Sequence, residues 1–317
     1  MTKQIAAINR RGFIKTAAGV SGYLAAVGLP LEALAKKETV RLTILHSNDI
    51  HSHIDKYPDN DPKYPGLGGA TRKAAAIKKI RESEDHVLLF DAGDMLQGSP
   101  YYNMYKGEVE FKVMSEMGYS GATIGNHEFD NGLEQLSQQM VHANFPFISS
   151  NYDFTGTPLE GKTLRYKIYE KGGAKIGVFG LGIELDGLVN KKMYGNTKYN
   201  DPMATAAEMS YFLRKTKKCD MVVCLSHLGY RYNSKKISDH IIAIKSKNID
   251  LIIGGHTHTY LDKPISYRNS DGKDVLVCQA GCYGIRIGRL DYAIEKKIIR
   301  DGSQISRIKY LNKTSHI

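Results

Sequence analysis

Residues 125–130 read GNHEFD and directly follow a short apolar run at 121–124. The run has the character of the end of a buried strand. An amide, an imidazole and two carboxylates placed this close to a core are costly to desolvate unless something pairs with them. We therefore expect a metal ion or a reacting group at this position, with partners supplied by the rest of the chain.

The composition is that of a globular protein with a sizeable core. The chain has 317 residues, of which 42% are hydrophobic, and could form one large domain or two small ones. Its formal charge of +11 would suit a nucleic acid or an anionic surface as a partner. The excess lies in scattered lysine pairs without an aromatic-interleaved basic stripe, so we interpret it as a solvated surface and expect no nucleic acid polymer as a partner.

The first 35 residues differ from the rest of the chain. They contain NRRGFIK, followed by an uncharged stretch of modest hydrophobicity, TAAGVSGYLAAVGLP. The arginine pair at 10–11 resembles a twin-arginine export signal, and the ALA tripeptide at 33–35 fits a cleavage site. A membrane anchor is the alternative, but the stretch is short and weak for a bilayer span. We expect residues 1–35 to be a cleaved signal peptide, and residues 36–317 to form a periplasmic catalytic domain without stable membrane insertion.

The four cysteines do not define a disulfide framework. Cys224 lies in the apolar run MVVCL and is expected to pack as a small hydrophobic residue. The spacing of Cys278 and Cys282 matches neither a zinc knuckle nor a redox motif. An oxidising compartment would permit bridges, also for Cys219, but the sequence predicts no particular one.

Short apolar runs alternate with amphipathic segments from residue 40 onward, which is typical of an α/β sheet protein covered by helices. Strands are expected at 40–46, 87–90, 122–124, 221–225 and 251–253. Helices are expected at 69–83 and at 201–217, the second opened by an Asp-Pro pair that favours a helix start.

Two later segments predict further strands. Residues 166–182, with paired glycines in their middle, predict a hairpin. Residues 275–310 are strand-like, and we expect charged turns at Glu295–Lys297 and Asp301–Gly302. No linker follows residue 40, so we expect one catalytic domain.

Side chains of the metal-binding kind follow each of five predicted strands. They are Asp49 and His51, then Asp94, Asn126 and His227, and finally His256 and His258. Sites in open α/β sheets form beyond the carboxyl ends of the strands, so these loops can meet in one place. Glycines at 93, 125, 254 and 255 permit the tight turns that this requires.

This oxygen and nitrogen set is larger than one tetrahedral metal needs. It suits two divalent cations about 3.5–4 Å apart, bridged by a carboxylate. Asn126 fits the same interpretation, because its amide oxygen can coordinate a cation without adding negative charge. The ligands serve manganese, zinc and iron alike, so the identity of the metals stays open.

The blocks D-x-H, GD, GNHE, SH and GGHTH, in this order, resemble the calcineurin-like metallophosphoesterase superfamily. GNHEFD and VCQAGCYG are most similar to its bacterial 5′-nucleotidase branch, and the match covers nearly all of residues 40–293. The resemblance implies a four-layer α-β-β-α sandwich. It also implies a partition of the ligands, with one metal on Asp49, His51 and His258, the other on Asn126, His227 and His256, and Asp94 as the bridge.

The resemblance implies that His127 does not bind a metal ion and has a catalytic role. His127 would face the substrate next to Asn126, and Asp130 behind it would orient the ring and favour its protonated form. The implied reaction is in-line attack on phosphorus by a water or hydroxide that two metal ions activate, without a phosphoenzyme. We therefore expect a 5′-nucleotidase-like phosphomonoesterase that acts on nucleotides.

Other functions stay open at this point. They are a nucleotide-sugar or 2′,3′-cyclic nucleotide phosphodiesterase, a thiosulfohydrolase, and a metal-dependent binding protein without catalysis. The pair His127 and Asp130 disfavours the last of these. Exported 5′-nucleotidases usually carry a C-terminal nucleotide-binding domain, which is absent from these 317 residues. We expect a separately encoded C-terminal domain to dock over the site. The alternative is that the catalytic domain alone accepts a wider range of phosphate esters.

The remaining polar residues receive structural interpretations. The histidines expected on the surface or in the core are His46, His53, His86, His142, His240 and His316. Glu128 and Asp91 are expected to hydrogen-bond backbone, and Arg72 to support the fold, while Arg286 is a candidate helper for phosphate. The 20 tyrosines are scattered along the sequence, and none is given a stacking role.

Overall fold

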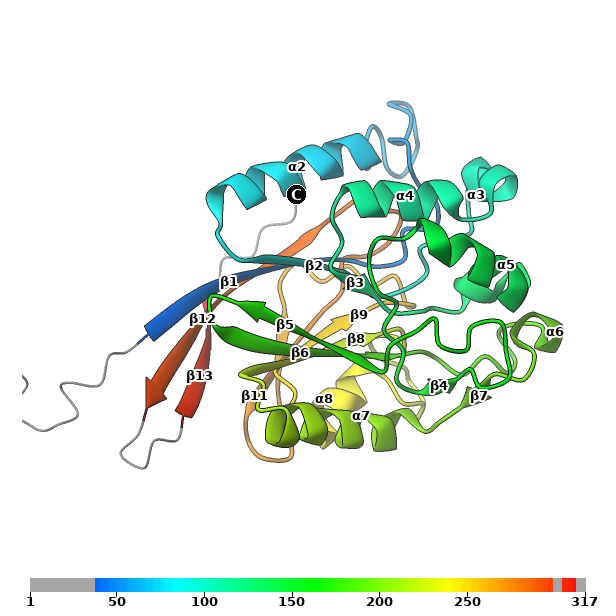
Figure 1. Ribbon diagram of the computed structural model, residues 1–317. Coiled ribbons are helices and arrows are strands. Elements are labelled where there is room, and N and C mark those ends of the chain that lie inside the picture. Colours follow the sequence, from blue (N-terminus) through cyan, green and yellow to red (C-terminus); the bar gives the residue numbers. More distant parts are fainter. Residues whose placement is uncertain (1–37, 299–303, 312–317) are drawn as a thin grey trace, which may run out of the picture. The chain divides into compact units, whose positions relative to one another are not determined.

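The computed structural model describes residues 38–298 and 304–311 (Figure 1). The expected signal peptide at 1–35, the expected turn at 301–302 and His316 lie outside these residues. Among the residues that the structure describes, no helix has the length and apolar character needed to cross a membrane.

The chain divides into two compact units. One comprises Thr39–Glu295 with Arg307–Ile317 and contains every candidate site residue. The other comprises Met1–Glu38 with Lys296–Ser306, of which the structure describes only strand ends. The layers and the site described below belong to the first unit.

Two sheets form the centre of this unit. The first has the strand order β13-β12-β1-β2-β3. Its strands are β1 Glu38–Ser47, β2 Val87–Asp91, β3 Gly121–Ala122, β12 Gly288–Ile298 and β13 Gln304–Tyr310. The neighbours β1, β2 and β3 run parallel, so their carboxyl ends lie at one edge.

The second sheet has the order β10-β11-β9-β8-β6-β5. Its strands are β5 Tyr166–Lys171, β6 Ala174–Leu181, β8 Met221–Ser226, β9 Leu251–Gly254, β10 Ile265–Arg268 and β11 Asp274–Cys278. The inner strands are parallel, and the outer two pair antiparallel with their neighbours. A short antiparallel pair is formed by β4 Tyr152–Asp153 and β7 Lys198–Tyr199.

Helices cover the outer face of each sheet. The helices of this unit are α2 Ala70–Ser83, α3 Pro100–Tyr105, α4 Glu108–Glu116, α5 Gly132–Gln139, α6 Lys191–Tyr194, α7 Pro202–Tyr211 and α8 Asp239–Lys245. Figure 1 shows α2 and α4 over the first sheet, and α7 and α8 beneath the second. Short helical turns lie at His127–Phe129, Met140–His142 and Phe212–Thr216.

Three buried apolar clusters separate these layers. The cluster between the sheets contains Val178 and Val223, whereas their chain neighbours Phe179 and Val222 belong to the cluster against α7 and α8. Successive side chains of a strand point to opposite faces, so these strands are apolar on both sides because both faces are covered. The result is the expected four-layer α-β-β-α sandwich, and that prediction is confirmed.

Most of the expected elements are present with shifted ends. The hairpin at 166–182 is formed by β5 and β6, and α7 begins after Asp201, whose side chain accepts a hydrogen bond from the Ala204 N–H at 2.6 Å. Residues 122–124 were expected as a strand, but β3 ends at Ala122. The helix expected to reach 217 changes at Phe212 from α-helix to a π-helical turn.

The turn expected at Glu295–Lys297 is wrong. These residues continue strand β12, which ends at Ile298. Tight turns favour Gly, Pro, Asn or Asp, whereas a run of Glu and Lys offers none of these. Strand β12 lies between β13 and β1 in the sheet, and charged residues alone do not end a strand that is paired on both sides.

Candidate metal centre

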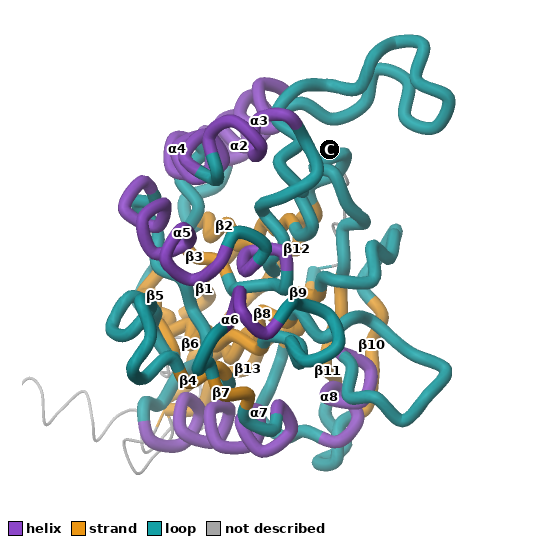
Figure 2. Tube along the Cα trace, turned by 90° about the vertical axis from the view of Figure 1, so that its right-hand side faces the viewer, coloured by secondary structure: helices purple, strands orange, loops and turns teal. Residues whose placement is uncertain are grey.

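The seven candidate ligands lie just beyond strand ends, on loops from both sheets. Asp49 and His51 follow β1, Asp94 follows β2, and Asn126 follows β3. In the second sheet, His227 follows β8, and His256 and His258 follow β9. Figure 2 looks onto the loops at this edge. The structure brings all seven residues together, as the contacts below show.

The first group is formed by Asp49, His51 and His258. The Nε2 atoms of His51 and His258 lie 2.9 Å apart, and His258 Nε2 lies 3.3 Å from Asp49 Oδ1. Two ring nitrogens at this distance repel through their lone pairs unless a proton or a cation lies between them. The three atoms therefore suit a single bound cation.

The second group is formed by Asp94, His227 and His256. Asp94 Oδ2 lies 2.9 Å from His227 Nε2, and His256 Nδ1 lies 2.9 Å from Asn126 Oδ1, which adds Asn126 to the group. His227 Nδ1 donates to the backbone oxygen of Ala92 at 2.7 Å. Since a carbonyl oxygen can only accept, this bond leaves Nε2 as the ligand atom, as is usual for histidines that bind metals.

Asp94 lies between the two groups. Its carboxylate belongs to the group with His227 and His256, and also to a further group with His51 and His127. The backbone N–H of His127 donates to Asp94 Oδ1 at 2.8 Å, while Oδ2 faces His227. One carboxylate that presents its two oxygens to different neighbours has the geometry of a bridge.

Glu128 supports the Asp94 loop from beneath. Its buried carboxylate accepts hydrogen bonds from the N–H groups of Gly125, Asp94, Met95 and Leu96, at 2.6, 2.9, 2.7 and 3.1 Å respectively. Asp91 accepts from the Gly93 N–H at 2.8 Å. The expectation that both carboxylates hydrogen-bond backbone is confirmed, and Glu128 joins the Asp94 and Asn126 loops.

The backbone of the site is unusual. Positive φ angles occur at Asp49, His51, Asp94, His256 and His258, which are five of the seven candidate ligands. This left-handed region is uncommon for residues other than glycine. Gly93 also has a φ of 91°, and a Cβ there would lie 2.7 Å from the Gly125 nitrogen. The loops therefore approach one another more closely than a side chain at position 93 would allow.

The carboxylates make the site favour positive charge. Burial lowers the pKa of the His227 imidazole, but the charge of Asp94 and its hydrogen bond outweigh this and raise that pKa to about 10. The hydrogen bond to Asp49 likewise raises the pKa of His258 to about 10. A divalent cation can take the place of such protons, because metal binding deprotonates its ligands. The donor set thus fits hard or borderline divalent cations.

His127 and Asp130 lie at the rim of the cluster. His127 Nδ1 is 2.7 Å from Asp130 Oδ2, and the side chain of His127 is 33% exposed, whereas that of the candidate ligand His227 is fully buried. The rings of His127 and His51 are in edge contact, with centroids 5.2 Å apart. His127 is therefore open to a molecule that binds beside the candidate ligands.

The arginines considered in the sequence have other partners. Arg286 pairs with Asp262 at 2.7 Å, and its guanidinium lies 5.0 Å from the centre of the Tyr260 ring. Arg72 donates to the backbone oxygen of Gly66, in agreement with a role in the fold. The four cysteines are free and buried.

An aromatic cluster next to the centre was not predicted from the sequence. His53, Tyr57, Tyr64 and Tyr283 form a network of ring contacts, and Tyr283 also contacts His51 and His258. A signal was present in the repeated tripeptide KYP at 56–58 and 63–65. The third tyrosine lies far away in the chain, so the sequence alone does not show that they meet.

The four-layer sandwich carries histidines at its strand ends, and the carboxylate of Asp94 is shared between their groups. This combination is the architecture of a metal-dependent hydrolase. Residues 42–260 match the family model described as calcineurin-like phosphoesterase, and the chain belongs to this family. Members of this family typically bind two divalent metal ions.

Comparisons with individual proteins point in the same direction. The chain is 33% identical over 277 residues to a snake venom 5′-nucleotidase of Gloydius brevicauda, covering 81% of this chain and 46% of that protein. The solved structure of a 5′-nucleotidase precursor from Thermus thermophilus matches with a TM-score of 0.72 at 29% identity, over 87% of this chain and 55% of that chain. Haemophilus influenzae NAD nucleotidase matches with a TM-score of 0.71 at 27% identity, over 86% and 55%. The chain thus spans about half the length of these relatives.

Proposed function

We propose that this chain is the catalytic part of a dinuclear metal-dependent phosphomonoesterase that acts on nucleotides in the manner of a 5′-nucleotidase. The observation that carries the proposal is the partly exposed His127–Asp130 pair beside two ligand groups that share Asp94. A site that only bound metal would have no use for this pair. The similarity to 5′-nucleotidases supports nucleotides as the substrates.

In this proposal, Asp49, His51 and His258 hold one cation, and Asn126, His227 and His256 hold the other, with Asp94 between them. When bound, the two cations would stabilise charge on the phosphoryl oxygens and lower the pKa of water toward about 7.

The protein supplies the proton chemistry and the positioning. His127, with Nδ1 bonded to Asp130, presents its second nitrogen to the phosphoryl oxygen or the leaving oxygen. Burial lowers the pKa of His127, but the Asp130 hydrogen bond and the nearby carboxylates outweigh this and raise it, so the ring favours its protonated form. In that form it can donate a proton to the departing alcohol or neutralise charge on the phosphate. Asn126, next to His127, contacts the same substrate.

The test is hydrolysis by the full chain of AMP, UDP-glucose, 2′,3′-cyclic AMP and p-nitrophenyl phosphate, with manganese, zinc or iron. We expect phosphate release from AMP that a chelator abolishes and added metal restores. Release from UDP-glucose or cyclic AMP in preference to AMP would assign a phosphodiesterase instead. Absence of phosphate release with every metal would contradict the proposal.

We further propose that residues 1–35 direct export to the periplasm by the twin-arginine route. The support is the arginine pair at 10–11, the following weakly apolar stretch and the small residues at 33–35. Replacing both arginines with lysine should trap the protein in the cytoplasm, and fractionation of cells that express either form measures this.

We also propose that a domain supplied by a partner chain completes nucleotide recognition. The support is that the 5′-nucleotidase relatives are about twice as long as the matched part. Native mass measurement of the protein purified from its own cells tests this, and a stable complex with a second chain is expected.

A further inference from the structure

The loop after β11 also reaches the edge where the candidate ligands meet. It comprises residues 279–283, QAGCY. Strand β11 runs parallel to β9, so its carboxyl end lies beside the start of the loop that carries His256 and His258. Among the residues that the structure describes, no member of the 279–283 loop belongs to a ligand group. The proposed phosphate chemistry therefore leaves this loop without a role.

The first residue of this loop, Gln279, is fully buried and holds the histidine loop through its side-chain amide. Its Nε2 donates a hydrogen bond to the backbone oxygen of Gly255 at 2.6 Å. Its Oε1 accepts one from the backbone N–H of Thr259 and another from the Thr257 hydroxyl at 3.2 Å. The Gly255 carbonyl can only accept and the Thr259 N–H can only donate, so these partners fix the orientation of the amide.

The three partners of Gln279 flank both candidate ligands of the histidine loop. His256 lies between positions 255 and 257, and His258 lies between 257 and 259. Both histidines have a left-handed backbone, with φ angles of 70° and 50°. Residues in such conformations persist only where the surrounding contacts hold them. The Gln279 side chain supplies contacts of this kind on each side of each histidine.

The 279–283 loop is itself fixed to the loop that carries Asp49. Asn48 Oδ1 accepts a hydrogen bond from the Ala280 N–H at 2.8 Å. Asn48 Nδ2 donates to the backbone oxygen of Gly281 and to Asp49 Oδ2, at 2.6 Å in each case. The Tyr283 N–H donates to the backbone oxygen of Asp49 at 2.7 Å. Gln279 therefore holds the histidine loop from a segment that is anchored to the first sheet.

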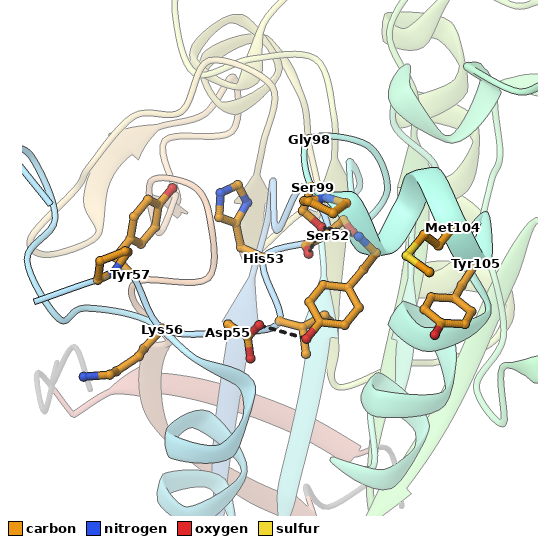
Figure 3. A pocket seen from close by; sticks show the side chains of 13 residues that line it. Ser52, His53, Asp55, Lys56, Tyr57, Gly98, Ser99, Met104 and Tyr105 are labelled. Carbon is orange, nitrogen blue, oxygen red and sulfur yellow. Dashed lines mark hydrogen bonds between the residues drawn. The ribbon is translucent and has the colours of Figure 1, made fainter.

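The far end of the 279–283 loop is packed as well. The ring of Tyr283 contacts that of His53, with centroids 4.6 Å apart. His53 and Tyr57 line one side of a pocket of about 530 Å³ (Figure 3). His53 Nδ1 donates to the backbone oxygen of His51 at 2.9 Å, which fixes the position of the ring. Both ends of the loop thus contact residues that neighbour candidate ligands.

We propose that Gln279 is a positioning residue that sets one ligand of each cation and so couples the two metal sites. The inference rests on the proposed function, in which His258 holds one cation and His256 holds the other. Outer hydrogen-bond partners that orient ligands typically contribute about 10- to 100-fold to metal affinity. Because the same amide holds both histidines, its loss lowers the affinity for both cations.

The first experiment is calorimetric titration of the metal-free full chain with manganese, at a temperature at which thermal unfolding shows each variant to be folded. Gln279→Met keeps the size of the side chain and removes its hydrogen bonds. We expect this variant to weaken both binding steps about 10- to 100-fold.

Asn269→Leu is the matched control. Asn269 is also a buried amide whose oxygen accepts two backbone hydrogen bonds, from the N–H groups of Asp271 and Lys273. It lies in the turn between β10 and β11, at the start of β11 and so at the other edge of the sheet. Asn269→Leu should lower the melting temperature and leave both manganese affinities unchanged.

A milder pair of variants keeps the test decisive if Gln279→Met does not fold. Thr257→Ala removes one partner of Gln279, whereas Thr257→Ser keeps the hydroxyl. We expect Thr257→Ala to weaken both binding steps, by less than Gln279→Met does, and Thr257→Ser to retain the wild-type affinities.

Unchanged affinities in Gln279→Met, or in Thr257→Ala where Gln279→Met is unfolded, would overturn the inference. A loss confined to one of the two binding steps would overturn it too, since the amide would then not serve both cations. Two manganese ions bound by a wild-type chain that releases phosphate from no ester would overturn the proposed function instead. The titrations need no substrate, so the two failures are distinguishable.

Discussion

His127 Nδ1 donates a hydrogen bond to Asp130 Oδ2 across 2.7 Å, one helical turn along the chain. The carboxylate can only accept, so the proton of the neutral ring is held on Nδ1, and the second nitrogen takes up or releases protons. His127 also shares a ligand group with His51 and Asp94, whereas Asp130 belongs to none of the groups found among the described residues.

His127→Ala should lower kcat by about 10²–10⁴-fold, the usual contribution of a positioned acid or base. Asp130→Asn should lower it less, because the ring remains but its orientation and charge are no longer supported. Steady-state kinetics with AMP, together with metal content by elemental analysis, checks this. Metal content should stay at the wild-type value in both variants, and full activity in His127→Ala would show that the assigned role is wrong.

Asp94→Asn should reduce the bound metal to fewer than two ions per chain. An amide carries no charge with which to neutralise two cations, and its two ends are not equivalent ligands. Elemental analysis after dialysis against a limiting metal supply measures the content. The control is Asp85→Asn at an exposed position, which should keep two ions. Two ions bound to Asp94→Asn with unchanged affinity would rule out the bridge.

Glu128→Gln should weaken metal binding about 10- to 100-fold and lower the melting temperature, although Glu128 is not a proposed ligand. One carboxylate oxygen becomes an NH₂ group that faces backbone donors, and those donors lose their acceptor. Calorimetric titration with manganese and thermal unfolding without metal measure the two effects. Glu82→Gln on the exposed face of α2 serves as the control. An unchanged metal affinity would limit Glu128 to a role in folding.

Lys73→Met should stabilise the protein at neutral pH. Burial lowers the pKa of Lys73 from 10.5 to about 8, partly offset by the charge of Asp91. Below pH 8 both folded and unfolded states carry the charge, and the folded state bears the cost of burying it, roughly 3 kcal/mol at most. Between pH 8 and 10.5 the unfolded state binds more protons, so the free energy of unfolding of the wild type rises with pH there.

Urea unfolding at pH 7 and across pH 8–10 checks this prediction. In Lys73→Met the free energy of unfolding should not show the rise with pH that this ammonium group causes. Its urea midpoint at pH 7 should be higher than that of the wild type. Lys79→Met, on the exposed face of the same helix, should show the wild-type pH profile. A lower midpoint for Lys73→Met would mean that the ammonium group has a compensating partner.

The sequence predicts that the candidate ligands meet at one edge because its signal is local and repeated. Each candidate ligand directly follows a short apolar strand, and the parallel arrangement brings strand ends to one edge, as Asp49 and Asp94 show. The aromatic cluster could not be predicted in this way. Tyr57 and Tyr283 contact each other only because the loop after β1 and the loop before β12 fold together, and no pattern in either segment encodes that meeting.

The errors in the predicted elements also have local causes. The strand before Asn126 is shorter than its apolar run because only Gly121 and Ala122 pair with β2, and the residues after them already turn toward the site. The helix after Asp201 was expected as one uniform element, since a change of hydrogen-bond pattern at Phe212 leaves no mark in residue type. Such changes depend on packing between elements, which a single sequence does not show.

The left-handed backbone at Asp49, His51, Asp94, His256 and His258 has a consequence for engineering. Each such residue costs of the order of 1 kcal/mol relative to glycine, which adopts this conformation freely. Replacing one of them, for instance His256, whose pKa burial lowers to about 3, with glycine should therefore make the metal-free protein more heat-resistant while destroying its chemistry. Selection of variants for thermal stability alone would favour the loss of these ligands. Each round of such a selection therefore has to include an activity assay.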